Sequence, residues 1–283
     1  MYFGANTFIW VSPFTTQDTG LFDHIKALGF DAVEIAVENQ DLIDPLIVKR
    51  ELMRTSLSGI VCGVFGPDRD LSSDDPVMRE NASHYLLWCI DFAHAIRSPV
   101  VVGPMYACVG KARLLPSEER RLELIRSIMG IRDCCDYALT KGVKLAIEPL
   151  NRFECDMINT VSQGLEYIQE VNRPNLGFHL DSFHMHLEEK DSAAAICLAG
   201  ERLFHLHACE NDRGVPGTGQ VHWREIAAAL KKIRYDEAIV IESFTPEVKS
   251  IAEAVCIWRT IAPSQDAIAR QGLTFLRSLD LRT

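Results

Sequence analysis

Short apolar runs rich in β-branched residues alternate with amphipathic helical segments eight times along the chain. The runs expected to form strands are residues 2–10, 31–37, 59–65, 99–105, 144–150, 176–181, 203–209 and 238–244. The helical segments that follow them are residues 20–29, 44–57, 77–97, 117–141, 160–172, 192–202, 223–234 and 248–262. Repeated strand–helix units place their strands parallel, and eight such strands close a barrel. The sequence therefore predicts an α/β fold, a (β/α)8 TIM barrel.

Residues at the expected helix ends support this division. Thr160 stands where an N-cap is expected, and Gly29 and Gly142 stand where C-caps are expected. Within residues 117–141 an apolar stripe at helical spacing is expected to face the core. The stripe consists of Leu122, Ile125, Ile128, Met129, Ile131, Cys135 and Ala138.

No linker rich in glycine, serine or proline divides the chain, so residues 1–283 are expected to form one barrel domain. Residues 266–276 are predicted to form a closing C-terminal helix outside the barrel. An open doubly wound sheet is the structural alternative. No GxGxxG motif follows the first strand, which argues against the dinucleotide-binding form of that fold.

Composition narrows the classes of partner. The formal net charge of −10 argues against nucleic acid, which attracts basic surfaces. No apolar run reaches the roughly 18 residues of a membrane span, and no signal-peptide pattern opens the chain, so we expect no membrane partner. Nine cysteines without CxxC spacing indicate buried free thiols in a reducing compartment. We therefore expect a cytoplasmic protein.

Four acidic or imidazole side chains stand at or near the ends of the last four expected strands. They are Glu148, Asp181, His207 and Glu242. The carboxyl ends of barrel strands meet at one rim, where neighbouring strands lie about 4.8 Å apart. Buried carboxylates are costly unless a cation neutralises them, and three oxygen donors with one imidazole suit Mn²⁺, Mg²⁺ or Co²⁺. The pattern predicts a metal site, and hence an enzyme; the alternative is a set of separate ion pairs with arginine or lysine.

The loops after these strands add polar groups that can face a ligand. Glu154, His184 and Arg213 lie in three of them, and a glycine-rich turn at 210–219 could fold over a ligand. Strand alternation turns His179 inward with Asp181, where we expect a packing or supporting role. His205 is expected to be a core or surface histidine.

Five stretches of the second half carry a resemblance to a known family. They are residues 146–154 (AIEPLNRFE), 180–185 (LDSFHM), 205–213 (HLHACENDR), 216–223 (PGTGQVHW) and 239–244 (IVIESF). In order and spacing they resemble the ketose 3-epimerases, the D-tagatose 3-epimerase and D-psicose (D-allulose) 3-epimerase group of sugar isomerase barrels. Residues 28–34 (LGFDAVE) resemble the second strand of that family.

The resemblance implies that Glu148, Asp181, His207 and Glu242 bind one divalent ion, with Mn²⁺ foremost and Co²⁺ or Mg²⁺ as alternatives. It implies that Glu148 and Glu242 also form the acid/base pair, and that Glu154, His184 and Arg213 hold the ketose at its O1–O3 end. The chain departs from better-known members at Asn6, where they carry an aromatic residue. It also departs at Val109, where some carry tryptophan.

The activity that the resemblance implies is metal-dependent C3 epimerisation of a free ketohexose or ketopentose through a cis-enediolate. A homodimer or homotetramer is expected with it. Related reactions on the same barrel remain open: aldose–ketose isomerisation, hydroxypyruvate isomerisation and inosose-type dehydration. A sugar-binding barrel without turnover is a further alternative.

Overall fold

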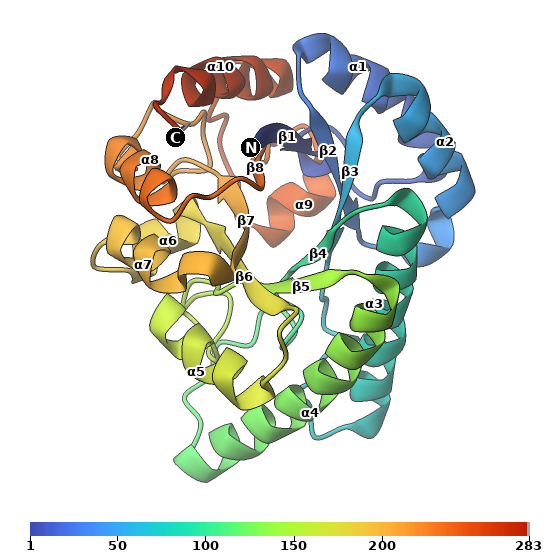
Figure 1. Cartoon of the computed structure of the whole chain (residues 1–283), viewed down its shortest axis with the longest axis vertical. Helices are drawn as coiled ribbons and strands as arrows, with labels where there is room; N and C mark the ends of the chain where they lie inside the picture. Colours follow the sequence, from blue (N-terminus) through green and yellow to red (C-terminus); the bar gives the residue numbers. More distant parts are fainter. Residues whose placement is uncertain (282–283) are drawn as a thin grey trace.

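Eight parallel strands, paired in sequence order and closed by β8 against β1, form the centre of the computed structural model, which describes residues 1–281 (Figure 1). The strands are β1 (Tyr2–Asn6), β2 (Ala32–Val37), β3 (Ser58–Gly63), β4 (Val100–Gly103), β5 (Lys144–Ile147), β6 (Leu176–Asp181), β7 (Leu203–Ala208) and β8 (Ala238–Ile241). The predicted (β/α)8 barrel is confirmed. The predicted domain ran to residue 283, and residues 282 and 283 lie outside the described part.

Ten α-helices within residues 1–281 surround or cap this barrel. They are α1 (Leu21–Leu28), α2 (Pro45–Thr55), α3 (Pro76–Ile96), α4 (Ser117–Lys141), α5 (Val161–Val171), α6 (Ser182–Glu188), α7 (Ser192–Ala199), α8 (Trp223–Lys232), α9 (Lys249–Ala254) and α10 (Gln265–Ser278). The residues expected as a closing helix form α10, which contacts β8. None of the helices among residues 1–281 combines the length and apolar character that crossing a membrane requires.

The residues at several helix ends act as the sequence predicts. Thr160 forms a capping box with Gln163 at the start of α5. Gly29 and Gly142 end α1 and α4 with φ of 98° and 69°, a left-handed conformation that glycine adopts at little cost.

Three predicted boundaries were wrong for local reasons. The first strand stops at Asn6 because its side chain accepts the Phe8 amide and begins a 3-10 turn, Thr7–Ile9. The last expected helix shortens to α9, and Cys256 just beyond it has a φ of 59°. Residues 182–188, expected as loop, form α6, because Asp181 caps the Phe183 amide at 2.7 Å.

The predicted stripe on α4 was wrong in part, because it covers two faces. Ile128, Ile131, Cys135 and Ala138 are buried, whereas Leu122, Ile125 and Met129 are 45%, 41% and 59% exposed. At 100° per residue, the exposed trio projects about 130° away from the buried set. An unpaired apolar strip therefore remains on the outer face of α4.

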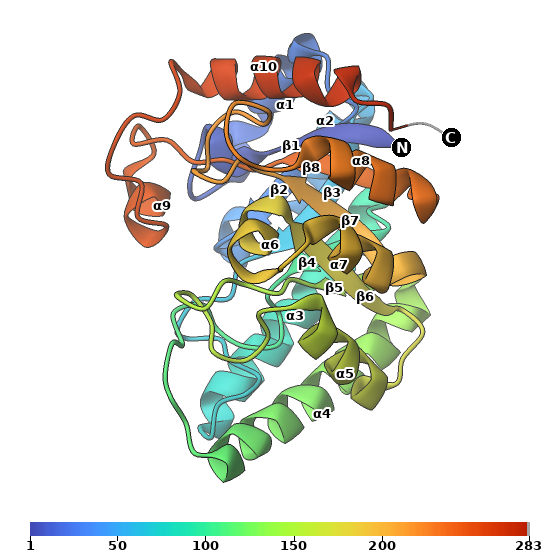
Figure 2. The same cartoon turned by 90° about the vertical axis from the view of Figure 1, so that its left-hand side faces the viewer.

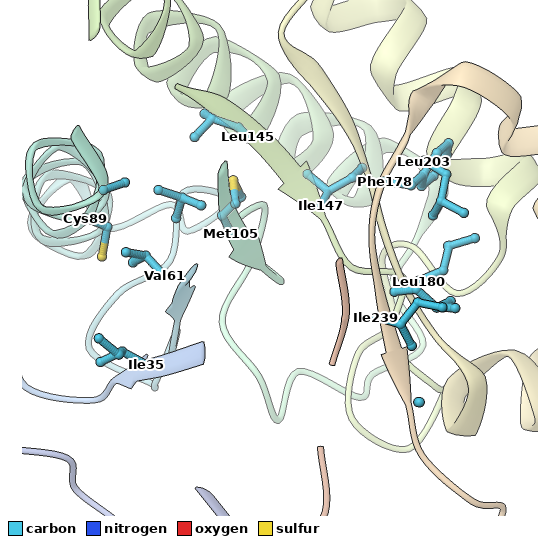
Figure 3. Close-up of a cluster of buried hydrophobic side chains, with 14 of the residues drawn as sticks. Ile35, Val61, Cys89, Met105, Leu145, Ile147, Phe178, Leu180, Leu203 and Ile239 are labelled. Atoms are coloured by element: carbon cyan, nitrogen blue, oxygen red, sulfur yellow. The ribbon is translucent and has the colours of Figure 1, made fainter. Parts of the chain in front are cut away.

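Two apolar layers hold the barrel together. Outward-facing strand residues pack under the helices, and Figure 3 shows Cys89 of α3 directed toward Val61 of β3 in this layer. A second cluster fills the interior near the amino ends of the strands and includes Ala146, Phe204 and Val240. The carboxyl ends of the strands are left for polar groups. In Figure 2, α9 lies at that end, away from the amino terminus.

Candidate metal centre

The four predicted ligand residues lie at the carboxyl ends of the last four strands. Glu148 and Glu242 directly follow β5 and β8, Asp181 ends β6, and His207 lies in β7. The β6–β7 register pairs Asp181 with His207. All four side chains are buried, with at most 7% of each residue exposed. The strands thus place three carboxylates and one imidazole inside one rim.

Their ligand atoms lie close enough to share an ion. Atoms of Glu148, Asp181 and His207 lie within 4.8 Å of one another, and so do atoms of His207, Glu242 and Glu34. His207 belongs to both groups, and its Nδ1 is 3.4 Å from Glu242 Oε2. The structure therefore brings the four predicted side chains together around His207.

The balance of charge at this rim favours a cation. Glu34, Glu148, Asp181 and Glu242 are buried here, and the guanidinium of Arg213 faces two of them. Separate ion pairs with arginine or lysine, the alternative, would need one such residue for each carboxylate. Among the described residues Arg213 is the only one that pairs with these four, and Asp181 and Glu242 share it; their other partners are histidines. Within residues 1–281, His207 Nδ1 has no hydrogen-bond partner. Oxygen donors with one imidazole are a donor set that fits a divalent ion.

The pKa values point the same way. Burial raises the pKa of Glu148 well above its usual value, and the nearby Glu242 and Asp181 raise it further, against His207. Burial also raises the pKa of Asp181, although Arg213 opposes the shift. Burial disfavours a charged His207, but Glu34 and Glu242 raise its pKa well above the usual value. These groups hold protons that a divalent cation would displace.

Arg213 lies inside the site although it comes from a loop. Its Nη1 is 2.7 Å from Asp181 Oδ2 and 3.4 Å from Glu242 Oε2. The guanidinium carbon lies 3.8 Å from the ring centroid of Phe183 on α6. Its backbone has a φ of 63°, and Ser243 Oγ donates a hydrogen bond to its carbonyl oxygen. A left-handed conformation in a non-glycine residue costs about 1 kcal/mol or more, so this packing holds Arg213 against strain.

Helix α6, which follows β6, contributes a histidine, His184, whose tautomer is defined by its hydrogen bonds. The Asn151 amide donates to His184 Nδ1 at 3.1 Å, so the proton of the neutral ring lies on Nε2. Burial lowers the pKa of His184 well below its usual value, and Arg213 lowers it further, which keeps the ring neutral. Nε2 lies 3.7 Å from Glu148 Oε1. His184 can therefore donate a hydrogen bond to a ligand beside Glu148.

Glu154 is linked to His184 through Asn151. Asn151 Nδ2 donates to Glu154 Oε1 at 2.7 Å and lies 3.0 Å from His184 Nδ1. Asn151 thus links two of the three predicted substrate-contact residues. Sequence reasoning did not single it out, although it stands between Glu148 and Glu154 in the stretch 146–154.

Hydrogen bonds to Glu210 fix the glycine-rich segment, residues 210–219, and the residues just after it. The buried carboxylate of Glu210 accepts hydrogen bonds from the amides of Gly217 and Val221, each at 2.8 Å, and from Trp223 Nε1 at 2.9 Å. A Cβ on Gly217 would lie 2.5 Å from the Phe275 ring of α10. Residues 217–221 are thus held by Glu210 and α10, while Arg213 of the glycine-rich segment faces the site; a turn that folds over a ligand stays a prediction.

Three buried residues beneath the rim were not assigned to the site. Glu34 lies halfway along β2, with Oε1 2.6 Å from His207 Nε2 and Oε2 2.7 Å from His205 Nε2. Burial opposes the charge of Glu34, but the two imidazoles bring its pKa well below the usual value. Asn6 also contacts this carboxylate. A carboxylate at an inward position of β2, between Ala32 and Ala36, was the available signal.

Comparisons with known proteins agree with this architecture. The sequence profile of the "Xylose isomerase-like TIM barrel" family matches residues 22–279. A probable ketose 3-epimerase of Synechocystis sp. is 36% identical over 275 residues, which cover 97% of this chain and 95% of that protein. An L-ribulose 3-epimerase of Methylomonas sp. is 32% identical over 251 residues, covering 88% and 87%. A D-allulose 3-epimerase of Methylomonas sp., solved with D-allulose, has a TM-score of 0.92 at 30% identity, covering 98% and 96%.

A closed parallel barrel with buried carboxylates and imidazoles at its carboxyl rim is the architecture of a sugar isomerase barrel. The chain belongs to the xylose isomerase-like TIM barrels and, within them, to the ketose 3-epimerase family. The resemblance inferred from sequence is confirmed, and the chain is an enzyme of the isomerase class.

Proposed function

We propose that this protein catalyses metal-dependent epimerisation of a free ketose at C3, through a cis-enediolate of the substrate. The observation that carries the proposal is the joint position of Glu148, Asp181, His207 and Glu242 at one buried rim. Relatives named D-psicose 3-epimerase and L-ribulose 3-epimerase support both the reaction and a ketohexose or ketopentose as substrate.

The metal would be held by those four residues, and Mn²⁺ suits them best, with Co²⁺ or Mg²⁺ as alternatives. When bound, a divalent ion supplies Lewis-acid polarisation of a substrate carbonyl, which acidifies the neighbouring C–H bond. A mixed set of carboxylates and one imidazole favours a borderline ion such as Mn²⁺ over the all-oxygen preference of Mg²⁺.

The two glutamates would exchange the proton. One carboxylate removes the C3 proton of the ketose and leaves a cis-enediolate; the other returns a proton to the opposite face and inverts C3. Glu148 and Glu242 follow strands β5 and β8, on different sides of β6 and β7, so they can reach the substrate from different directions. Both carboxylates are buried at the rim, at 7% exposure each, so a proton taken by either is kept from bulk solvent.

Glu154, His184 and Arg213, which follow strands β5, β6 and β7, would hold the substrate and stabilise the charge that develops. His184 donates from Nε2, and Arg213 offers a guanidinium whose orientation is fixed by Asp181 and Phe183. Glu154, fixed by Asn151, accepts hydrogen bonds from sugar hydroxyls. A free sugar is proposed over a sugar phosphate, because the relatives named above are epimerases of the free ketoses L-ribulose and D-psicose.

Incubation with D-fructose, D-tagatose and L-ribulose in D₂O with Mn²⁺, followed by NMR, tests the reaction. We expect deuterium at C3 and the appearance of the 3-epimer. An aldose product would assign aldose–ketose isomerisation instead. Turnover of hydroxypyruvate, with no exchange in any ketose, would assign hydroxypyruvate isomerisation, and turnover of an inosose would assign dehydration. Sugar binding without exchange would leave a binding protein.

We also propose a cytoplasmic homodimer or homotetramer. All nine cysteines have free thiols, and seven of them are buried, which suits a reducing compartment. The exposed strip of Leu122, Ile125 and Met129 on α4 offers apolar area that a second copy would cover. Light scattering after size-exclusion chromatography is expected to give two or four times the 31.8 kDa chain mass. A monomer would contradict the assembly and leave the reaction untouched.

A further inference from the structure

A buried carboxylate lies beneath the proposed metal ligands, and the reaction as described does not use it. Glu34 is fully buried on β2, and side chains from two other strands converge on it. Asn6 Nδ2 donates to Oε1 at 2.7 Å, His207 Nε2 lies 2.6 Å from the same oxygen, and His205 Nε2 lies 2.7 Å from Oε2. A buried carboxylate with three nitrogen partners restricts the orientation of the side chains that contact it.

The direction of the contact with His207 follows from the other partner of the same oxygen. Glu34 Oε1 accepts a hydrogen bond from Asn6 Nδ2 at 2.7 Å, and as an acceptor atom it receives a second hydrogen bond from His207 Nε2 at 2.6 Å. The other ring nitrogen, Nδ1, then faces Glu242 Oε2 at 3.4 Å. It has no hydrogen-bond partner within residues 1–281, so it is the ring nitrogen that a cation at the rim would meet.

Asn6 ends β1, the strand between β2 and β8, and it joins Glu34 to Glu242. Its Nδ2 donates to Glu34 Oε1 at 2.7 Å and also lies 3.3 Å from Glu242 Oε1. Its Oδ1 accepts the Phe8 amide at 2.8 Å, which fixes the orientation of the amide group. One oxygen of Glu242 is thereby held from below, while Oε2 is the atom nearest His207 Nδ1.

We propose that Glu34 and Asn6 are positioning residues of the metal centre. Glu34 fixes the ring and tautomer of His207, and Asn6 fixes Glu242, so that Nδ1 and Oε2 face the same cation. The inference rests on the proposed function, since it assumes that these two ligands bind a metal. Removal of such a supporting partner typically weakens metal binding by about 10- to 100-fold.

The test is the dissociation constant of Mn²⁺, measured on metal-free protein from the EPR signal of unbound Mn²⁺. We expect Glu34→Gln to weaken binding by about 10- to 100-fold, because a carboxamide is a poorer acceptor and presents an N–H₂ group to the imidazoles. Glu38→Gln is the matched control. Glu38 follows the same strand and is partly buried, but it accepts from Ser12 Oγ at 2.8 Å and has no histidine partner among the described residues.

Turnover at high Mn²⁺ concentration distinguishes a positioning role of Glu34 from a loss of folding or a direct role in catalysis. Excess Mn²⁺ is expected to restore most of the turnover of Glu34→Gln, because the ligands themselves remain. Should Glu34→Gln fail to fold, Asn6→Ser decides. Serine keeps an acceptor for the Phe8 amide but is too short to join both carboxylates, and we expect Mn²⁺ binding about 3- to 10-fold weaker.

Two results would overturn the positioning role in different ways. Folded Glu34→Gln that binds Mn²⁺ within threefold of the wild type would remove the role and leave the proposed function standing. Wild-type protein that binds no Mn²⁺ at all would remove the proposed function itself, and this role with it.

Discussion

The two halves of the barrel rim differ in chemistry. The ends of β5 to β8 carry Glu148, Asp181, His207 and Glu242, whereas β2, β3 and β4 end at Val37, Gly63 and Gly103. Phe8 and Ala36, from the turn after β1 and from β2, form a separate apolar cluster with Phe244, Ile251 and Ile257 from the segment after β8. We call this cluster, with the ends of β2, β3 and β4, the apolar half of the rim. The charged half, at the ends of β5 to β8, would hold the cation, and the apolar half would exclude water from it.

Substitutions in the two halves are therefore expected to change different kinetic constants. Groups on the charged half would take part in proton transfer or bind the cation, so their loss should lower the rate itself. Groups on the apolar half shape and dry the site, so their loss should change substrate affinity more than rate. The following changes test that contrast.

The largest effect is expected from Glu148→Gln and Glu242→Gln. Each change removes a proposed proton carrier, so kcat should fall by about 1,000-fold or more. The control is Glu237→Gln, since Glu237 precedes β8 at the other end of the barrel and pairs there with Lys144 at 3.3 Å. Steady-state rates with normal circular dichroism spectra would measure the effect; a kcat within tenfold of the wild type would remove these glutamates from the acid/base assignment.

A smaller effect is expected from a change of pH, which should alter the affinity for Mn²⁺. Burial raises the pKa of Glu148 and of Asp181, and Glu34 raises that of His207 against burial, so Mn²⁺ must displace protons. Metal affinity should therefore weaken by at least about tenfold from about pH 8 to about pH 6. An affinity independent of pH over this range would contradict the assigned proton-bearing ligands.

The same shifts set the sign of the stability change. A raised pKa means that the folded protein binds protons more tightly than the unfolded chain. The stabilisation is full below the unfolded pKa, 4.5 for Glu148, and is lost as pH rises through the higher folded value. In metal-free protein the melting temperature of the wild type should therefore fall relative to that of Glu148→Gln over that rise, because the variant has no proton to lose at this position, and the stabilisation of the wild type by Mn²⁺ should grow.

The smallest effect is expected on the apolar half, from Phe8→Leu. The Phe8 and Phe244 ring centroids are 5.7 Å apart, and loss of such a pair costs about 1 kcal/mol. We expect KM to rise about two- to fivefold and kcat to stay within about twofold. Phe204→Leu, in the interior cluster near the amino ends of the strands, is the control, with a similar loss of stability and an unchanged KM. A large fall in kcat for Phe8→Leu would break the contrast.

The sequence allowed the four proposed metal ligands to be predicted, but not the residues beneath them, such as Glu34. Glu148, Asp181, His207 and Glu242 could be found because ligand-type residues followed four apolar runs at strand–helix intervals. Glu34 could not be assigned in the same way, because it lies within a strand and its partner His207 is 173 residues away. Only the closed barrel, in which β2 faces β7 across the interior, brings the two together.

Local secondary structure, too, could be predicted only where it depends on residues close together in the sequence. Eight strands and the caps at Gly29 and Gly142 follow from residue patterns, which depend on neighbours in sequence. Helix α6 was missed because Asp181 serves two roles: Oδ1 caps the helix, while Oδ2 faces Arg213. The division of α4 into a buried and an exposed face depended on which side the barrel occupies, which periodicity alone does not give.

A crystal grown with Mn²⁺, with data collected at the manganese absorption edge, gives the most direct test. We expect one strong anomalous peak enclosed by Glu148, Asp181, His207 Nδ1 and Glu242, with His207 Nε2 still held by Glu34. A rim with no anomalous peak, and with those four side chains turned away from one another, would contradict the metal centre and the reaction proposed for it.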